Sequence, residues 1–203
     1  MDKLDEGRSR LIKSGGFFDE EFIIRLYMEM LVFMSCFGKT GGFRTLLLER
    51  RDCLATTRLM SLHVGKGQTA GDAVKRALGY IKDPTKTENG ILVTSYGCTP
   101  QTAEAEFMLM RREDLTITGR RRGKDDVLAY HLRQSFKPGE ITPEEANRLG
   151  QELAQRFTKG DHAYIVCTHI DKKHVHNHII WNSVSLDCDR KFCNFWGSSK
   201  AIR

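Results

Sequence analysis

From residue 55 onward, apolar and polar positions recur with two different periods. A period of two, in stretches rich in β-branched and aromatic residues, predicts strands over 56–63, 91–96, 127–136, 163–168 and 174–182. Apolar positions three and four apart predict helices over 69–81, 99–112 and 144–157. The last helix follows a threonine cap at Thr142 and a proline in its first turn. Helices interspersed with strands predict an α+β fold, in which an antiparallel sheet of about five strands has helices packed on one face.

The two strands nearest the C-terminus contain a concentration of histidine. Four of the chain's seven histidines fall within ten residues, at His169, His174, His176 and His178. Because alternate side chains of a strand share a face, the last three point to the same side of the sheet. The polar segment 171–173 predicts a hairpin turn, which folds His169 back over this group.

These histidines suggest a metal site, since imidazole is the commonest side-chain ligand for metals in proteins. Three imidazoles from two paired strands would form an open site that leaves coordination positions for water or substrate. Asp171 is close enough to orient one ring through its other nitrogen. The alternative is a histidine-rich strand without metal, whose rings lie on a solvated face or are hydrogen-bonded in a core.

Composition narrows the class of protein. The chain has 203 residues, 40% of them hydrophobic, which is enough for one good core. No apolar run approaches the roughly eighteen residues of a membrane span, so we expect no membrane insertion. The N-terminus lacks the features of a signal peptide, and the six cysteines contain no CxxC pair. These observations favour reduced thiols in a cytoplasm.

The net charge of +6 is unevenly distributed along the chain. Residues 1–53 contain nine basic and nine acidic side chains, so the whole excess lies in residues 54–203. A basic domain favours a polyanionic partner, of which nucleic acid is the first candidate; a soluble protein that is merely basic is the alternative. Candidate DNA contacts lie in a glycine-bounded loop and among aromatic residues near the C-terminus: Arg120, Arg121, Arg122, Lys124, Arg190 and Lys191.

The histidine pattern resembles that of a known family. His169-x-Asp171, followed by His176-x-His178 and Asn182, is similar to the three-histidine motif of relaxases. Relaxases are the mobilisation nucleases of conjugative plasmids and conjugative transposons, and they belong to the HUH endonuclease superfamily, which has the α+β architecture predicted above. The resemblance implies that His169, His176 and His178 are the metal ligands.

The sequence departs from the family pattern in three places. The residue between the paired histidines is usually hydrophobic but here is Asn177, so the pair His174-Val175-His176 stays open as an alternative. Leu54 stands where similar relaxases have their initiator methionine. We therefore expect residues 54–203 to form the catalytic domain and residues 1–53 to be an upstream extension of the reading frame or a separate appendage. The chain ends in mid-pattern, which suggests a C-terminally truncated domain.

The resemblance also implies further site residues. In similar relaxases a tyrosine in the context of Tyr80 is the nucleophile, and a phenolate suits this role because it can both attack a phosphodiester and leave again. Tyr96 is the second candidate. Lys82 and Lys86 follow Tyr80 closely and would hold phosphate oxygens. Ser135 corresponds to a serine of the family's second motif, which contacts DNA near the cleavage site.

The function implied by the resemblance is site- and strand-specific nicking of DNA by metal-assisted transesterification, with a 5′-phosphotyrosyl intermediate that serves conjugative transfer. The metal would be Mg²⁺ or Mn²⁺, with other transition metals possible in vitro. The implied partners are single-stranded or supercoiled DNA at an origin of transfer, accessory mobilisation proteins and a coupling protein, in a bacterial cytoplasm. Three alternatives stay open: a replication initiator or transposase of the same superfamily, a degenerate relaxase, and a non-catalytic, metal-stabilised DNA-binding domain.

Overall fold

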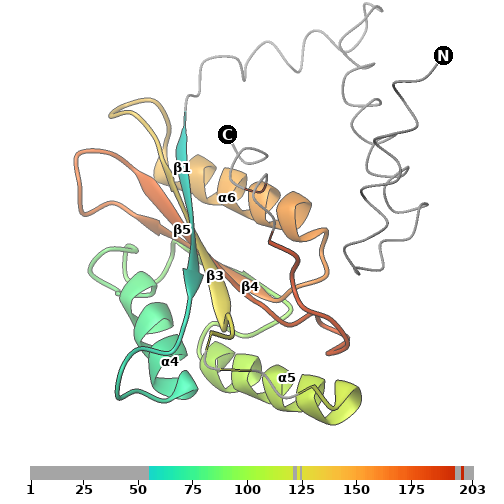
Figure 1. Ribbon diagram of the computed structural model, residues 1–203. Coiled ribbons are helices and arrows are strands. Elements are labelled where there is room, and N and C mark those ends of the chain that lie inside the picture. Colours follow the sequence, from blue (N-terminus) through green and yellow to red (C-terminus); the bar gives the residue numbers. More distant parts are fainter. Residues whose placement is uncertain (1–54, 121–122, 124, 195–197, 199–203) are drawn as a thin grey trace, which may run out of the picture. The chain divides into compact units, whose positions relative to one another are not determined.

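The structure is a computed structural model that describes residues 55–120, 123, 125–194 and 198. Its elements, in chain order, are β1 (Thr56–Leu62), α4 (Ala70–Ile81), β2 (Val93–Tyr96), α5 (Ala103–Thr118), β3 (Ala129–Ser135), α6 (Pro143–Thr158), β4 (Tyr164–His169) and β5 (His176–Asn182) (Figure 1). All eight elements predicted from the sequence in this part of the chain are present. The predicted extension, residues 1–53, lies outside the described residues.

Local signals fix the ends of the helices. Thr69 and Asp72 form a reciprocal capping box at the start of α4, and the Thr142 side chain accepts from the Glu145 amide at the start of α6. The helix expected over 99–112 begins later, at Ala103, and continues to Thr118. It ends there because Gly119 adopts the left-handed conformation that glycine tolerates.

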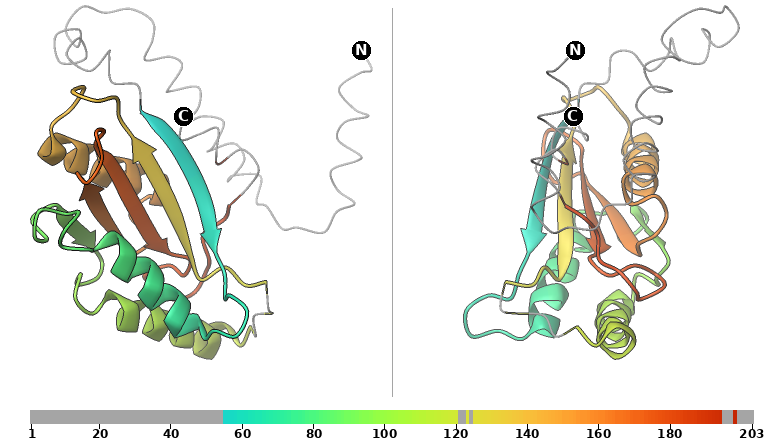
Figure 2. Two further views of the ribbon diagram at one scale, coloured as in Figure 1. Left: turned by 90° about the vertical axis from the view of Figure 1, so that its left-hand side faces the viewer. Right: turned by 45° about the vertical axis from the view of Figure 1, so that its right-hand side comes forward.

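The five strands form one antiparallel sheet in the order β1-β3-β5-β4-β2, which confirms the predicted α+β class. The helices, however, lie on both faces of the sheet rather than on one (Figure 2). Helices α4 and α5 cover a core that includes Phe107, Ile165 and Ile180, whereas α6 packs over Val166 and Trp181. The reason is that β4 and β5 are buried along their whole length, so both of their faces need a covering layer.

Asn177, the residue that departs from the family pattern, faces α6 and not the histidines. Its side-chain amide donates to the Ala146 carbonyl (2.5 Å) and to the Gln134 side chain (3.0 Å), and its oxygen accepts from the Thr168 hydroxyl (2.7 Å). A hydrophobic residue could not make these bonds, so the polar side chain fits because its neighbours on this face are polar. Within the described part of the chain, no helix is long and apolar enough to cross a membrane.

Candidate metal and nucleophile site

Pairing of β4 with β5 brings three histidines together. His169 lies opposite His176 in the register, and His178 lies two residues further along the same face. One ring nitrogen from each residue lies within 4.8 Å of the other two, and all three residues are buried. Two metal–nitrogen bonds of about 2.1 Å each span at most about 4.2 Å, so small ring movements would close this group around one ion. We call His169, His176 and His178 the histidine cluster.

His174 is outside the histidine cluster. Its ring centroid lies 5.2 Å from that of His176, and its backbone carbonyl accepts from Nδ1 of His176 at 3.4 Å. It precedes the first residue of β5, where the regular alternation begins. The structure therefore gathers the three histidines that the resemblance selected, and gives His174 a supporting contact.

Each ring of the histidine cluster is held by one nitrogen. His169 Nε2 donates to the Ile81 carbonyl at 2.8 Å, since a carbonyl oxygen can only accept. His178 Nδ1 is 2.8 Å from Nε2 of His131 on β3. The other nitrogens, His169 Nδ1 and His178 Nε2, are buried without a hydrogen-bond partner in the described structure. Buried polar atoms are rarely left unpaired, and rings tied at one nitrogen and open at the other are typical of metal ligands. The donor set therefore fits a divalent metal ion.

Burial keeps these imidazoles neutral. It is the main cause that lowers the pKa of His169 and His176 below the usual value, and it lowers the pKa of His178 to about 2. It also lowers the pKa of His131 to about 4, with a contribution from the Arg133 charge. A neutral imidazole has a free lone pair, so the histidine cluster can bind a metal ion near pH 7 without first losing protons.

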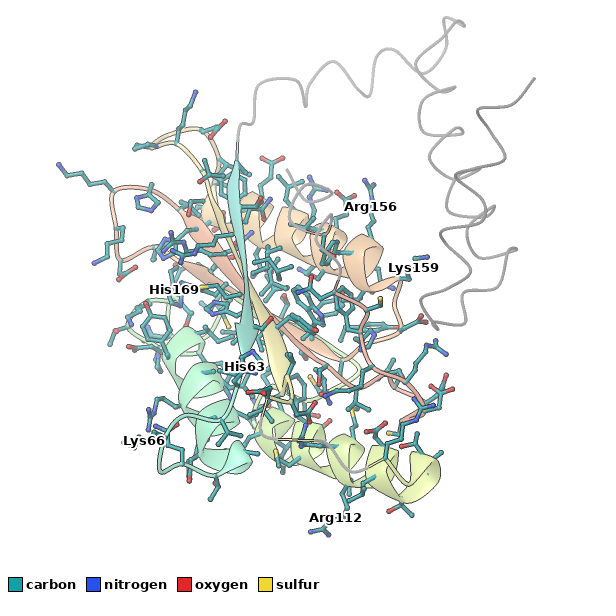
Figure 3. The ribbon with its side chains drawn as sticks, in the orientation of Figure 1. His63, Lys66, Arg112, Arg156, Lys159 and His169 are labelled. Carbon is teal, nitrogen blue, oxygen red and sulfur yellow. The ribbon has the colours of Figure 1, made fainter. Side chains whose placement is uncertain are left out.

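Tyr80 lies beside the histidine cluster at the C-terminal end of α4. Its ring centroid is 5.6 Å from that of His178 and 5.9 Å from that of His169, and the residue is 53% exposed. The end of α4 is fixed there because the Ile81 carbonyl accepts from His169, the cluster residue labelled in Figure 3. The ammonium group of Lys86 lies 4.1 Å above the Tyr80 ring centroid.

Tyr96, the second candidate for the nucleophile, is elsewhere. Its ring stacks on Tyr164 with centroids 5.2 Å apart, and its hydroxyl donates to the Gly160 carbonyl at 3.2 Å. Gly160 closes the C-terminal end of α6, on the opposite face of the sheet from the histidine cluster. The geometry therefore favours Tyr80 over Tyr96.

The sequence suggested that Asp171 orients one ring of the histidine cluster, but in this structure other groups do so. Asp171 is exposed, and its carboxylate lies 3.7 Å from the Lys172 ammonium group. Nε2 of His169 is hydrogen-bonded to the Ile81 carbonyl. Nδ1 of His178 is hydrogen-bonded to the His131 ring. Asp171 still acts at a distance, because its charge is among the secondary causes that raise the pKa of His169 against the dominant effect of burial.

Lys86, Ser135 and Lys82 were predicted to contact DNA near the nucleophile, and the structure gives them different surroundings. Lys86 contacts the Tyr80 ring and lies 3.4 Å from Asp83. Ser135 lies opposite His176 in the pairing of β3 with β5, so it is on the face of the histidine cluster. The ammonium group of Lys82 donates to the Pro100 carbonyl at 2.5 Å, and its role in holding phosphate stays a prediction.

Among the other predicted DNA contacts, the structure describes Arg120, Arg190 and Lys191. Arg120 is exposed just after α5, while Arg121, Arg122 and Lys124 lie outside the described residues. Arg190 pairs with Asp161 at 3.1 Å, and Lys191 pairs with Asp126 and donates to the Val127 carbonyl at 2.7 Å. The backbone of residues 190–192 is hydrogen-bonded to residues 183–185, which follow the C-terminal end of β5. His176 is at the other end of that strand. These ion pairs give Arg190 and Lys191 a structural role in the free protein, and their assignment as DNA contacts stays a prediction.

The sequence interpretation did not assign a role to His131 or to Arg133, which lie on β3 beside the histidine cluster. Arg133 is directly opposite His178 in the register. A signal was present, because His131, Arg133 and Ser135 alternate with buried residues along one strand and therefore share a face. Only the pairing of β3 with β5 shows that this face is the one with the histidine cluster.

Comparison with known proteins identifies the family of this chain. Residues 80–203 match the family described as "Relaxase: MobA/VirD2-like, nuclease domain". The chain is 35% identical over 139 residues to Protein rlx of Staphylococcus aureus, an alignment that covers 68% of this chain and 37% of the relative. It is 33% identical over 140 residues to the group II intron-interrupted relaxase LtrB of Lactococcus lactis subsp. cremoris, covering 60% of this chain and 25% of the relative. The chain thus spans about a quarter to a third of the length of these relatives. On the strength of the family match, which takes in the tyrosine and all three clustered histidines, this chain belongs to the MobA/VirD2-like relaxases and contains their nuclease domain.

Proposed function

We propose that this chain nicks one strand of DNA at a specific site by transesterification, with Tyr80 as the nucleophile and with the histidine cluster holding a divalent metal ion. The observation that carries the proposal is the position of Tyr80, whose ring lies 5.6 Å from that of His178 while remaining 53% exposed. A nucleophile that attacks a large substrate must be accessible and must lie next to the groups that bind the scissile phosphate.

The metal ligands in this proposal are His169, His176 and His178. When bound, the ion would polarise the scissile phosphate and stabilise negative charge on the displaced oxygen. Mg²⁺ or Mn²⁺ is proposed from the family, and an all-imidazole donor set suits Mn²⁺ and later transition metals better than Mg²⁺.

Tyr80 would form a new bond from its phenolic oxygen to the phosphorus as the bond from phosphorus to the 3′ oxygen breaks. The phenolic proton passes to water, since Tyr80 is exposed, and the displaced oxygen takes up a proton to become a 3′ hydroxyl. The 5′ end of the broken strand then stays attached to Tyr80, and the reverse reaction can rejoin a strand because the phenolate is also a good leaving group. The ammonium group of Lys86, above the Tyr80 ring, is placed to bind a neighbouring phosphate oxygen.

Two further groups position the histidine cluster. The Ile81 carbonyl fixes the ring of His169, and it follows Tyr80 directly in the chain, so one helix end holds both the nucleophile and a ligand. The proposal assigns Nδ1 of His178 as the donor to Nε2 of His131, 2.8 Å away, which leaves Nε2 of His178 with the lone pair that a metal ion needs. Neither group contacts the substrate in this proposal.

The biological setting proposed with this chemistry is conjugative mobilisation. The substrate would be DNA at an origin of transfer, and the partners would be accessory mobilisation proteins and a coupling protein in a bacterial cytoplasm. The catalytic unit would be residues 54–203, preceded by the extension 1–53.

Covalent capture tests the proposed function and identifies the nick site in the same experiment. The full chain is incubated with Mn²⁺ and a library of random single-stranded oligonucleotides, denatured, and examined for protein attached to DNA. Mass spectrometry of the adduct then identifies the modified residue, and sequencing of the attached DNA gives the preferred cleavage site. The expected result is a phosphotyrosyl bond at Tyr80.

Two tyrosine variants provide the matched comparison. Tyr80→Phe should abolish the adduct but leave binding of the oligonucleotide nearly unchanged, because only the nucleophilic oxygen is removed. Tyr96→Phe, on the opposite face of the sheet, should form the adduct normally. An undiminished adduct in Tyr80→Phe would refute the assignment, and DNA binding without any adduct in the wild type would favour a non-catalytic, metal-stabilised binding domain.

A further inference from the structure

The sheet continues past the histidine cluster onto two strands that carry polar side chains on the same face. In the register, His178 on β5 lies opposite Arg133 on β3, and Arg133 lies opposite Arg58 on β1. Residues directly opposite one another in an antiparallel sheet point to the same side. Neighbouring strands are about 4.8 Å apart, so Arg58 is about 10 Å from His178 when measured between backbones. We call Arg58 and Arg133 the arginine row.

A second row lies beside the first. His176 is opposite Ser135, and Ser135 is opposite Thr56. Thr56 and both members of the arginine row are exposed, and Ser135 is partly exposed. The surface that leads from the edge of the sheet to the histidine cluster is therefore open and is lined by hydroxyl and guanidinium groups, which are common donors to phosphate oxygens.

The arginine row has an electrostatic cost in the free protein. Two like charges directly opposite each other destabilise a pair of strands. Four other arginines each pair with a carboxylate: Arg111, Arg148, Arg156 and Arg190. Within residues 55–120 and 125–194, no ion pair is formed by either member of the arginine row. Two adjacent, exposed and uncompensated guanidinium groups form a site ready for an anion.

Arg133 lies beside the histidine cluster and its support. It is directly opposite His178 in the register, and it is two residues from His131 on the same face of β3. Arg133 is therefore next to the ring that is hydrogen-bonded to His178. An anion bound at the arginine row would lie adjacent to the position where the scissile phosphate is expected.

We propose that Arg58 and Arg133 bind consecutive parts of the phosphate backbone of a single DNA strand, which crosses β1 and β3 on its way to the histidine cluster. The inference rests on the proposed function, because it takes the histidine cluster as the place of the scissile phosphate. Guanidinium groups suit this role because their planar donors match phosphate oxygens in pairs. They read no bases, so the contribution to binding is independent of sequence.

Salt dependence of DNA binding tests the arginine row. Fluorescence anisotropy measures the affinity of the full chain for a labelled single-stranded oligonucleotide of mixed sequence, in EDTA and at a series of KCl concentrations. The double variant Arg58→Gln/Arg133→Gln should bind roughly tenfold more weakly at low salt. Its plot of log affinity against log salt should be less steep by about 1.4, because each neutralised phosphate of a single strand contributes about 0.7 to the slope.

The matched control removes the same charge from the opposite face. Arg148 and Arg156 lie on α6, and Figure 3 shows Arg156 on that helix, away from His169. Arg148→Gln/Arg156→Gln should leave both the affinity and the slope close to those of the wild type. If the two double variants behave alike, or if the wild type does not bind the oligonucleotide, the inference is overturned.

Thermal unfolding separates binding from a structural role. Loss of two opposing like charges should leave the melting temperature of Arg58→Gln/Arg133→Gln unchanged or slightly higher; a clear decrease would mark these residues as structural and overturn the inference. The covalent capture assay separates this inference from the proposed function. An adduct in the wild type, together with an unchanged salt slope in the arginine variant, refutes the inference alone. A reduced slope without any adduct refutes the nicking activity alone.

Discussion

Removing the His131 imidazole should weaken metal binding about tenfold, although His131 is not one of the proposed ligands. Its Nε2 lies 2.8 Å from Nδ1 of His178, and in the proposed site this bond keeps the proton of His178 on Nδ1 and leaves Nε2 free for the metal ion. In His131→Ala the proton can move to Nε2, and binding of a metal ion must then reverse that change. A hydrogen bond of this kind contributes about 1 kcal/mol net, which corresponds to roughly fivefold in affinity. Loss of ring orientation adds to this, and supporting residues typically contribute about 10- to 100-fold.

Isothermal titration with Mn²⁺, without DNA, measures this affinity directly. His131→Gln should recover part of it, because the amide oxygen can accept from Nδ1 of His178. His63→Ala removes an exposed imidazole that follows β1 and should bind Mn²⁺ like the wild type (Figure 3). Circular dichroism checks that each variant is folded. Affinity in His131→Ala within twofold of the wild type would refute the idea that the hydrogen bond prepares His178 for metal.

Two further predictions concern stability. Gly150→Ala should lower the free energy of unfolding by about 1–3 kcal/mol, because the added Cβ would lie 2.7 Å from Asn177 Nδ2 and 2.8 Å from Val166 Cγ1. Gly79→Ala should raise it by about 0.5–1 kcal/mol, because the added Cβ meets no atom within 4 Å. Urea unfolding measures both changes. Burial raises the pKa of Asp126, but the charges and hydrogen bonds of Lys191 and Arg111 outweigh it and lower the pKa overall. The ionised form therefore stabilises the fold above the unfolded pKa of about 3.9, and this contribution is lost as pH falls through the lower folded value. Asp126→Asn should thus cost about 2 kcal/mol at pH 7, the usual contribution of a hydrogen bond to a charged group, and the difference from the wild type should shrink below about pH 4. An equal difference at pH 7 and pH 3 would contradict this assignment.

The sequence by itself determined the elements and much of the histidine cluster. Alternation along 174–182 placed His176 and His178 on one face, because the period of a strand is a local property of the chain. The short turn after His169 fixed the hairpin that brings the third histidine opposite His176. The start of α6 was also readable, since Thr142 and Pro143 act on the first turn of the helix that follows them. The relaxase family followed from motifs of this local kind, and the family match confirms it.

Only the tertiary structure decided which groups support the histidine cluster and which basic residues are near it. His131 meets His178 across 47 positions of the chain, and Ile81 meets His169 across 88. The sequence also contained no sign that Arg190 and Lys191 pair with carboxylates far away in the chain. The local pattern of apolar residues does not predict which strands pair with one another or which face of the sheet a distant helix covers. Both faces of β4 and β5 are buried, so α6 covers the face opposite the histidine cluster. The arginine row lies on β1 and β3, beside the cluster, and stays exposed.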